Sequence, residues 1–400
     1  MIKWYEKTLD ELGTVARGKS KHRPRDAEFL YGGPYPFIQT ADVKNANLYI
    51  NSFSQTYSEE GLKQSKIWPV GTLCITIAAN IADTAILGVE ACFPDSIIGF
   101  IPNEDICNVR FVKYYLSYYQ NSLKQISQGA AQDNLNLKKL LSFKFKIPDK
   151  NVQDKISLIL SSYDDLIENN FKRIKLLEES AELIYKEWFV NFRFPGYEKC
   201  EFVDGKPKEW NTLKANEFGN VITGKTPSTK KTEYYGDEIP FIKTPDMNDG
   251  IYVVKTNQML SEAGAKSQEK KFIPRDAVLV SCIGTLGVVA LAKELSQFNQ
   301  QINAIVCNKK EYIYYLYFKF KSLKEYLEAL GSNGATMGNV NKSKFENIEI
   351  LKPDEKLLQK YNCFSEPIFK EILNLQLSNE KLKEARDILI PKLIMGEIEV

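Results

Sequence analysis

Two long heptad patterns, about 205 residues apart, constrain the fold of this 400-residue chain more than any other feature. From Ile156 to Trp188, apolar residues return at alternating steps of four and three, which is the a/d spacing of a coiled coil. The same spacing returns from Tyr361 to Leu393 in a more polar form. Two amphipathic helices in one ordinary core would show the same local pattern, so the choice depends on whether the preceding segments also repeat.

The helix faces predicted to meet are a/d positions of the two patterns. They are Ile167, Asn170, Ile174, Leu177 and Ile184 in the first helix, and Ile372, Leu375, Asn379, Leu382 and Leu389 in the second. An asparagine at such a position fixes the register of a coiled coil at a cost in stability, or else it lies at a solvated edge. Arg386 is harder to bury and indicates either a partly covered helix or a carboxylate opposite it. Positions 379 and 386 are therefore where we expect a partner protein or a gap in the pairing.

The segments before the two helices repeat in the same order. YPFIQTADV at 35–43 corresponds to IPFIKTPDM at 239–247, and GAAQDNLN at 129–136 corresponds to GATMGNVN at 334–341. We therefore predict an α+β fold made by tandem duplication, in which each copy is a mixed α/β domain followed by one long helix. The two helices are predicted to pair as an antiparallel coiled coil within the chain and to act as a spacer between two heads. The predicted segments are 1–150, 151–194, 195–354 and 355–400.

Composition limits the class of protein. The formal net charge of +2 gives no overall electrostatic footprint for nucleic acid, so contact with DNA has to come from local patches. The single histidine, His22, lies in a run of basic residues and is poor material for a catalytic triad or a His-rich zinc site. The seven cysteines form no CxxC pair, and no stretch has the apolar length of a signal peptide core or a membrane span. We expect a cytoplasmic protein with reduced thiols, no metal and no membrane contact.

Each copy contains a match to the phosphate-loop pattern GxxxxGK[ST], at 13–20 (GTVARGKS) and 219–226 (GNVITGKT). A phosphate loop needs an apolar strand before the first glycine and a helix that begins at the lysine. The residues before both matches are polar, and Pro227 follows the second match directly. The sequence therefore argues against nucleotide binding, although a P-loop-like NTPase stays an alternative.

A better interpretation of these segments is a basic loop that meets the phosphates of DNA, with a solvated loop as the alternative. The candidate residues are Arg17, Lys19, Lys21, Arg23 and Arg25 in the first copy, and Lys225, Thr226, Ser228, Lys230 and Lys231 in the second. The amides Gln132, Asn134, Asn339 and Asn341 in the later loops are suited to the edges of adenine, but asparagine is also common in turns for backbone reasons. We find no motif for binding S-adenosylmethionine and no convincing set of nuclease carboxylates, so no catalytic residue is predicted.

Three groups of residues resemble the specificity subunit of Type I restriction-modification systems. They are GKTPSTKKTEYYGDEIPFIKTPDM at 224–247, ANIADTAILGVEACFPDSIIGFIPN at 79–103, and the helix endings IYKEWF and ILIPKLIMGEIEV. The resemblance covers essentially the whole chain in the order of that family. The first copy departs from it, because GKSKHRPRD stands where the second copy has GKTPSTKK.

The resemblance implies a non-catalytic DNA-recognition subunit. Each recognition domain would read one half of an asymmetric, bipartite site in double-stranded DNA, and the helix pair would set the gap between the halves. Two methyltransferase subunits would dock on the helices, and restriction (translocase) subunits would join the larger complex. S-adenosylmethionine, ATP and magnesium would be bound by those partners and not by this chain. A protein scaffold that does not contact DNA is the remaining alternative.

Overall fold

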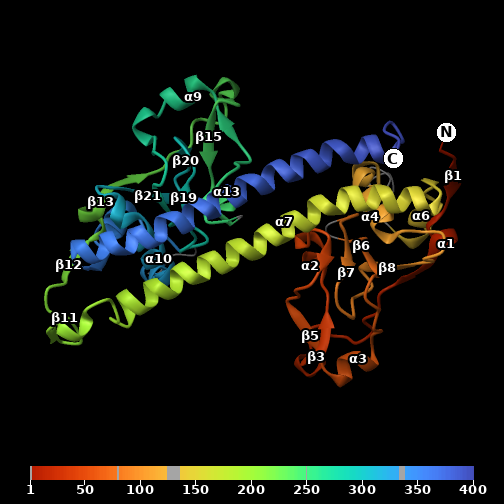
Figure 1. The fold of residues 1–400 in the computed structure, drawn as a ribbon, viewed down its shortest axis with the longest axis horizontal. Coiled ribbons are helices and arrows are strands. Elements are labelled where there is room, and N and C mark those ends of the chain that lie inside the picture. The colour runs from red at the N-terminus through yellow and green to blue at the C-terminus, as the bar shows by residue number, and fades with distance from the viewer. Residues whose placement is uncertain (1, 79–80, 124–135, 249, 333–337) are drawn as a thin grey trace. The chain divides into compact units, whose positions relative to one another are not determined.

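The computed structural model describes residues 2–78, 81–123, 136–248, 250–332 and 338–400 (Figure 1). The chain forms two compact units. Unit 1 consists of Met1–Asn169 together with Glu380–Val400, and unit 2 is Asn170–Asn379. Both long helices contribute to both units, so each unit combines one predicted recognition domain with a part of each helix.

Unit 1 is built on a five-stranded sheet with the order β2 (Gly13–Arg17), β8 (Ile97–Pro102), β6 (Leu73–Thr76), β7 (Thr84–Leu87) and β4 (Tyr49–Ile50). All neighbours are antiparallel except β4 and β7. β6 is buried along its whole length, as its apolar sequence LCIT requires. The smaller strands of this unit are β1 (Trp4–Lys7) with β9 (Phe145–Pro148), and β3 (Tyr31–Phe37) with β5 (Gln55–Tyr57).

Unit 2 repeats this sheet strand for strand. Its order is β13 (Gly219–Thr223), β21 (Ile302–Cys307), β18 (Val278–Ser281), β19 (Val289–Ala292) and β16 (Tyr252–Val253). The register repeats too, because Cys74 pairs with Gly99 in unit 1, and adding 205 to both numbers gives the pair Leu279 and Ala304 in unit 2. The predicted tandem duplication is therefore confirmed.

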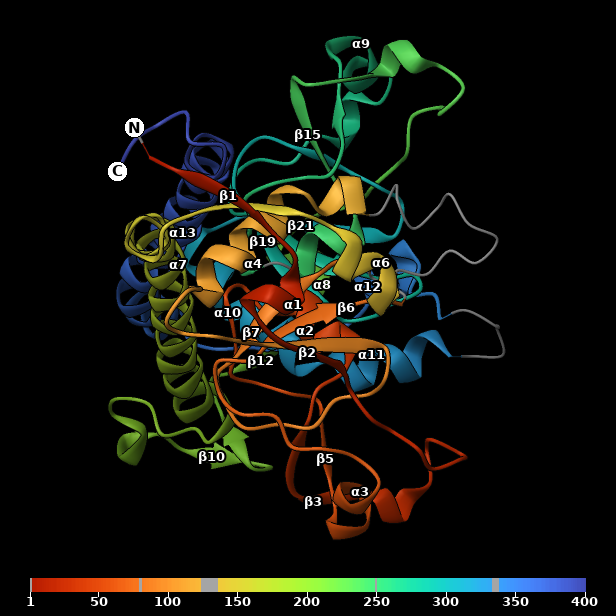
Figure 2. The ribbon, with the colours of Figure 1, turned by 90° about the vertical axis from the view of Figure 1, so that its right-hand side faces the viewer.

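The remaining strands of unit 2 form smaller sheets. They are β14 (Tyr235–Gly236), β17 (Met259–Leu260), β15 (Ile239–Ile242) and β20 (Gln297–Phe298) in one sheet, β12 (Asn211–Lys214) with β22 (Glu349–Lys352), and β10 (Phe202–Val203) with β11 (Lys206–Pro207). Figure 2 shows β3, β5 and α3 (Glu59–Lys63) gathered in a small lobe of unit 1, and β15 with α9 (Glu262–Lys266) in a small lobe of unit 2.

A tyrosine-rich helix covers one face of each sheet. It is α4 (Val109–Tyr118) in unit 1 and α10 (Ile313–Ser322) in unit 2. Both helices use an equivalent tyrosine to hold the strand that follows them. The Tyr115 hydroxyl accepts a hydrogen bond from Lys146 N at 3.0 Å, and the Tyr315 hydroxyl donates one to Leu351 O. Further α-helices among the described residues are α1 (Leu9–Leu12), α2 (Thr40–Asn45), α6 (Leu137–Ser142), α8 (Ala215–Phe218), α11 (Lys324–Gly331) and α12 (Lys342–Glu346).

The two long helices are α7 (Lys150–Tyr185), which continues as a π-helical turn over Lys186–Val190, and α13 (Glu355–Ile394). They run antiparallel within each unit. In unit 2, Asn170 bonds to Asn379, Arg173 to Glu371 at 2.7 Å and Ala181 to Tyr361 at 3.4 Å, so one number rises as the other falls. In unit 1, apolar residues of both helices share one core, which includes Ile156, Leu160, Ile390, Leu393 and Ile394. The predicted pairing within one chain is confirmed.

The predicted contact positions of the helix pair lie in two environments. Ile167, Asn170, Ile174, Ile372, Leu375 and Asn379 are buried, and Leu177, Ile184, Leu382 and Leu389 are half-buried. No helix in the described part of the chain is both long enough and apolar enough to cross a membrane.

Candidate nucleic-acid interface

The basic loop of unit 1 begins where β2 ends, and its backbone is fixed to a turn at 93–97. Gly18 N donates to Ile97 O at 2.8 Å, and Lys19 N donates to Phe93 O at 2.9 Å. A side chain at Gly18 would place its Cβ 2.2 Å from Pro94 O, so only glycine allows this approach. We call these paired main-chain contacts the glycine clasp and the segment 93–97 the polar turn of unit 1.

Unit 2 repeats the glycine clasp with its own polar turn at 298–302. Gly224 N donates to Ile302 O at 3.2 Å, and Lys225 N donates to Phe298 O at 2.9 Å. A Cβ at Gly224 would lie 2.0 Å from Asn299 O. The basic loop and the polar turn are therefore held together in the same way in both copies, although the residues at the tips of the turns differ.

Three arginines predicted to contact DNA also have partners within unit 1. The Arg17 guanidinium donates from Nε and Nη2 to Asp95 O, at 3.0 and 2.7 Å. Arg25 Nη2 lies 2.8 Å from Asp95 Oδ1 in a half-exposed ion pair. Arg23 Nη1 donates to the carbonyl oxygens of Ser20 and His22, at 2.9 and 2.7 Å. The side chains of Lys19 and Lys21 are exposed. Contact between DNA and these three arginines and two lysines remains a prediction.

Two of the predicted residues of unit 2 form side-chain hydrogen bonds. Thr226 Oγ1 donates to Gln300 Oε1 at 2.5 Å, and Lys231 Nζ donates to the Tyr234 hydroxyl at 3.0 Å. Ser228 and Lys230 are exposed. Their contact with DNA also stays a prediction.

A lysine cluster of unit 2 joins three segments that are far apart in the sequence. Partial burial lowers the pKa of Lys271, and the nearby charges of Lys342 and Lys225 lower it further. A hydrogen-bonded chain links two of these segments, because Thr223 Oγ1 donates to Asn303 Oδ1 at 2.6 Å and Asn303 Nδ2 donates to Val340 O at 3.2 Å. The lysine cluster, Lys225, Lys271 and Lys342, concentrates positive charge as a phosphate backbone requires.

The amide candidates of the later loops have different outcomes. Asn341 Oδ1 accepts from Lys344 N at 2.9 Å and so caps α12, which is the turn role that competed with base reading. Asn339 is exposed, and its N donates to Gly331 O at 3.2 Å. Gln132 and Asn134 lie outside the described residues.

Sequence reasoning missed the residues of the polar turns. Asp95 of unit 1 corresponds to Gln300 of unit 2, since the two numbers differ by 205, and Gln301 follows Gln300. Gln300 is exposed, and Gln301 Oε1 accepts from Asn299 Nδ2 at 2.9 Å. The run of amides in QFNQQIN was the signal that could have identified them.

The phosphate-loop matches lack the strand, loop and helix arrangement of a nucleotide site. Gly13 and Gly219 each begin a strand of the main sheet, and no helix begins at Lys19 or Lys225. Across the residues that the structure places, no group of three or more His, Cys, Asp or Glu side chains is arranged to hold a metal ion.

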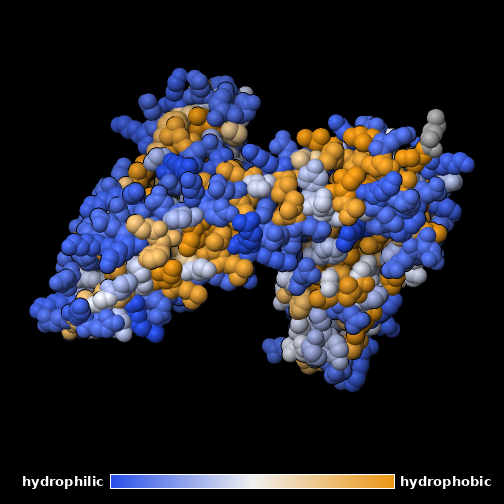
Figure 3. Space-filling view, in the orientation of Figure 1, coloured by the Kyte–Doolittle hydropathy of each residue, from blue (hydrophilic) through white to orange (hydrophobic). Residues whose placement is uncertain are grey.

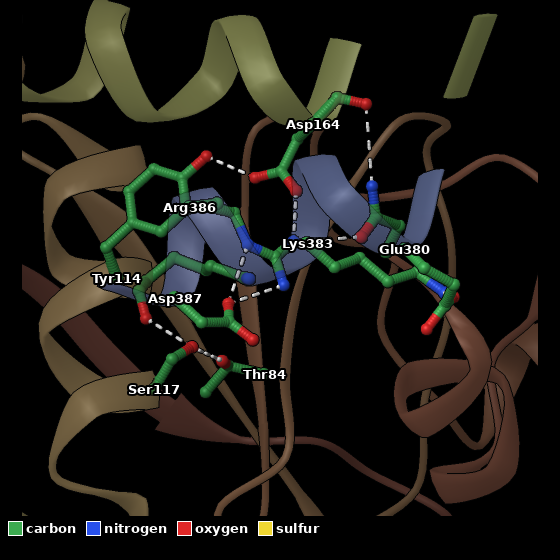
Figure 4. A network of polar contacts seen from close by, with 10 residues as sticks. Thr84, Tyr114, Ser117, Asp164, Glu380, Lys383, Arg386 and Asp387 are labelled. Atoms are coloured by element: carbon green, nitrogen blue, oxygen red, sulfur yellow. Dashed lines mark hydrogen bonds and ion pairs between the residues drawn. The ribbon is translucent and has the colours of Figure 1, made fainter. Parts of the chain in front are cut away.

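A buried polar network connects the recognition domain of unit 1 to both helices (Figure 4). Arg386 of α13 forms an ion pair with Asp164 of α7, and the Asp164 side chain is fully buried. The other carboxylate oxygen of Asp164 accepts a hydrogen bond from the Tyr114 hydroxyl of α4. Burial and the Asp164 charge raise the pKa of Tyr114. Arg386 Nη1 also donates to Asn47 Oδ1 at 3.3 Å.

This network corrects one expectation about the helix pair. Arg386 does meet a carboxylate, as one of its two interpretations required. Asn379 is buried and accepts a hydrogen bond from Asn170, so the solvated-edge alternative is wrong. A gap at positions 379 and 386 is also wrong, because each side chain has a partner within its own unit.

The equivalent place in unit 2 is apolar. Adding 205 to 164 gives Phe369, and subtracting 205 from 386 gives Ala181, and both are fully buried. The Phe369 ring lies 4.2 Å from that of Tyr314, the counterpart of Tyr114 in the YYL motif of the other copy. At this place, the two copies therefore attach their domains to the helices by different chemistry.

The family model for the Type I restriction modification DNA specificity domain matches this chain twice, over residues 1–179 and 207–361. The chain belongs to the DNA specificity subunits of Type I restriction-modification systems. This specificity subunit has two recognition domains, and the family consists of non-catalytic DNA-recognition components. The P-loop alternative is not favoured.

Relatives match the specificity subunit over most of its length. It is 32% identical over 322 residues to the HindI specificity subunit of Haemophilus influenzae, which covers 64% of this chain and 69% of the relative. It is 27% identical over 415 residues to the MjaIX specificity subunit of Methanocaldococcus jannaschii, with coverage of 99% and 94%. The crystal structure of the S subunit from M. genitalium has the same fold, with a TM-score of 0.58 at 14% identity over 98% of this chain and 96% of that one.

Proposed function

We propose that each recognition domain of this specificity subunit reads one half of a bipartite, asymmetric site in double-stranded DNA. The observation that supports this most directly is the repeated glycine clasp, which presents chemically different polar turns, with Asp95 in unit 1 and Gln300 in unit 2. Two similar domains with unlike surface groups suit two half-sites of unlike sequence. The lysine cluster and the basic loops supply the contacts to phosphates.

The helix pair is the part that sets the gap between the half-sites and docks the methyltransferase subunits. Leu176, Leu183 and Val190 are spaced by seven residues and are 62%, 62% and 53% exposed, which gives α7 and its π-helical end an apolar stripe in unit 2. Figure 3 shows apolar residues within the mostly hydrophilic surface along this part of α7. An exposed apolar stripe on a helix fits the face of a partner helix.

The partner subunits bind the cofactors and catalyse the reactions. Two methyltransferase subunits bind S-adenosylmethionine, and restriction (translocase) subunits bind ATP and magnesium. The complex acts in the cytoplasm. The family membership supports the partner subunits. The buried thiols of Cys74, Cys107 and Cys282, whose pKa values are raised by burial, support a cytoplasmic location.

The stoichiometry is tested by measuring the mass of the reconstituted complex with methyltransferase subunits. We expect two methyltransferase subunits for each specificity subunit.

The test of two-domain reading is a domain exchange. The subunit is reconstituted with its methyltransferase subunit, and methylation is mapped over a DNA library in which both half-sites are randomised. Replacing residues 1–150 by the same segment of another specificity subunit should change one half of the methylated site and leave the other half intact. A change in both halves, or in neither, contradicts the proposal.

The test of the spacer role changes the lengths of the helices. Insertion of one heptad into both α7 and α13, within their unit 2 portions, preserves the a/d pattern. If both domains approach one face of the duplex, the centres of the half-sites should lie one helical turn, or about 10 bp, apart in the wild type. The tolerated gap should be longer in the variant. An unchanged gap with retained methylation argues against the spacer role.

A further inference from the structure

The two polar turns are equivalent in backbone and unlike in side chain. Their sequences are FPDSI at 93–97 and FNQQI at 298–302, and the same glycine clasp fixes each of them. Asp95 and Gln300 therefore occupy the same place in the two recognition domains. A difference in what these domains recognise can arise here without any difference in the fold.

The side chains at the tips of both turns are exposed and already held in position. Asp95 keeps 40% of its side-chain surface exposed while Arg25 Nη2 donates to its Oδ1 at 2.8 Å and to its Oδ2 at 3.1 Å. Gln300 is exposed while Thr226 Oγ1 donates to its Oε1 at 2.5 Å. Ordering them on a ligand costs less entropy than ordering free side chains, because their rotamers are already restricted.

The charges around the two tips fit contact with DNA. A carboxylate that faces DNA is repelled by the phosphates unless a cation offsets its charge, and Arg25 does so for Asp95. Arg17 adds a second cation, whose guanidinium binds the Asp95 carbonyl. Gln300 carries no charge and needs no such partner. Lys225, in the glycine clasp of the same unit, therefore has no carboxylate to neutralise at the tip of the turn and can attract phosphate.

We propose that Asp95 and Gln300 are equivalent base-reading residues, one for each half-site, and this inference rests on the proposed function. A carboxylate only accepts hydrogen bonds, so Asp95 selects a base pair that presents an amino donor in the major groove, in the manner of cytosine N4. A carboxamide both donates and accepts, so Gln300 selects adenine through N6 and N7. The first and second half-sites differ at the matching base pair for this reason.

The experiment uses Asp95→Asn and Gln300→Glu in the full chain, each reconstituted with the methyltransferase subunit and read on the randomised library. Both substitutions keep the shape of the side chain and change its charge together with its hydrogen-bonding capacity. Asp95→Asn should shift the preference at one base pair of one half-site by about tenfold, and Gln300→Glu should do so at one base pair of the other half-site. All other positions should keep their preferences.

Matched controls make the same charge changes elsewhere. Asp105→Asn in unit 1 and Asn211→Asp in unit 2 alter exposed side chains outside the polar turns and should leave every base preference unchanged. If a tip variant gives no methylation, Asp95→Glu and Gln300→Asn are read in its place, since they move the same functional group by one methylene. A shift confined to one base pair then still supports the proposal.

Three results overturn the inference. The first is that neither variant changes the methylation preference at any base pair. The second is that a variant changes methylation equally for all sequences. The third is that both variants change the preference in the same half-site. A reconstituted complex with the wild-type subunit that methylates without a bipartite preference would contradict the proposed function itself. Wild-type protein with a bipartite preference that neither tip variant alters contradicts the assignment of Asp95 and Gln300 alone.

Discussion

Asn170 Nδ2 donates a hydrogen bond to Asn379 Oδ1 at 2.8 Å, and the two side chains are 7% and 2% exposed. The bond joins one a/d position of each long helix inside unit 2. Only one alignment of the helices places these amides opposite each other, so the pair fixes the register. Asn379 Nδ2 is buried and has no hydrogen-bond partner among the described residues, which is the cost of this arrangement.

Removing one amide should therefore destabilise the helix pair. We expect Asn170→Ala to lower the free energy of unfolding by about 1–3 kcal/mol, because Asn379 then loses its partner in a buried place. The neighbouring exposed substitution Asn169→Ala is the control and should cost less than about 0.5 kcal/mol. The double substitution Asn170→Leu with Asn379→Leu should recover the loss, as measured by urea unfolding followed by circular dichroism. A loss in the double variant as large as in the single one would contradict the account.

The Asp164–Arg386 pair predicts a larger effect in unit 1. Arg386→Ala leaves a fully buried carboxylate without its cation and should cost about 3–5 kcal/mol. Asp387→Asn removes only the exposed contact of the same arginine and should cost less than about 1 kcal/mol. Asp164→Phe with Arg386→Ala reproduces the residues at the equivalent place in unit 2, so it should be more stable than Arg386→Ala alone in urea unfolding. Equal stability of these two variants would show that the buried charge is not the cause.

The lysine cluster predicts a change in the salt dependence of DNA binding. Lys225→Gln, Lys271→Gln and Lys342→Gln should each weaken binding about equally for all sequences and reduce the slope of log K against log salt by about 1. Lys208→Gln, an exposed substitution elsewhere in unit 2, should leave the slope unchanged. Fluorescence anisotropy of labelled DNA over a series of salt concentrations measures both quantities. A loss that depends on the base sequence would mean that these lysines contact bases.

Lys271 also predicts a pH dependence. Burial and the two neighbouring lysines lower the pKa of Lys271 below its ordinary value of 10.5, so it loses its charge earlier than an exposed lysine as the pH rises. Affinity for DNA should fall as the pH rises through that lowered pKa, and proton uptake should accompany binding there. Lys271→Arg stays charged and should remove this part of the pH dependence in the anisotropy measurement. The sign is opposite for stability, because between the lowered pKa and 10.5 the unfolded chain binds more protons, so the folded state gains stability as the pH rises.

The repeat made the architecture predictable from the sequence. Heptad spacing identified α7 and α13, and the correspondence of the segments before them implied two sheets of one topology. These features are predictable because the residue pattern of each segment determines its own secondary structure. The partners of Asn379 and Arg386 were not predictable in the same way, since Asp164 is 222 residues from Arg386 and no local pattern connects them.

Only part of the candidate DNA interface could be predicted, because its other contacts join segments that are distant in the sequence. The basic run from Arg17 to Arg25 was visible in the sequence, but Asp95 lies 70 residues beyond Arg25, and its ion pair appears only when the chain folds. Lys271 and Lys342 join Lys225 from separate segments, and neither belongs to a basic loop that would have singled it out. The glycines of the two phosphate-loop matches proved informative in another way, since Gly18 and Gly224 allow the close approach of two backbones.

The division of the chain into units has a consequence for synthesis on the ribosome. Unit 2 is one uninterrupted stretch, 170–379, and all of its residues are made before residues 380–400. The first part of unit 1 is translated before unit 2, yet unit 1 also needs residues 380–400. These include Leu393 and Ile394 of its interior and Arg386, the ion-pair partner of Asp164. Unit 1 therefore begins to be synthesised before unit 2 but can complete its fold only after unit 2 has been translated. Until then, Asp164 has no Arg386 with which to form its ion pair.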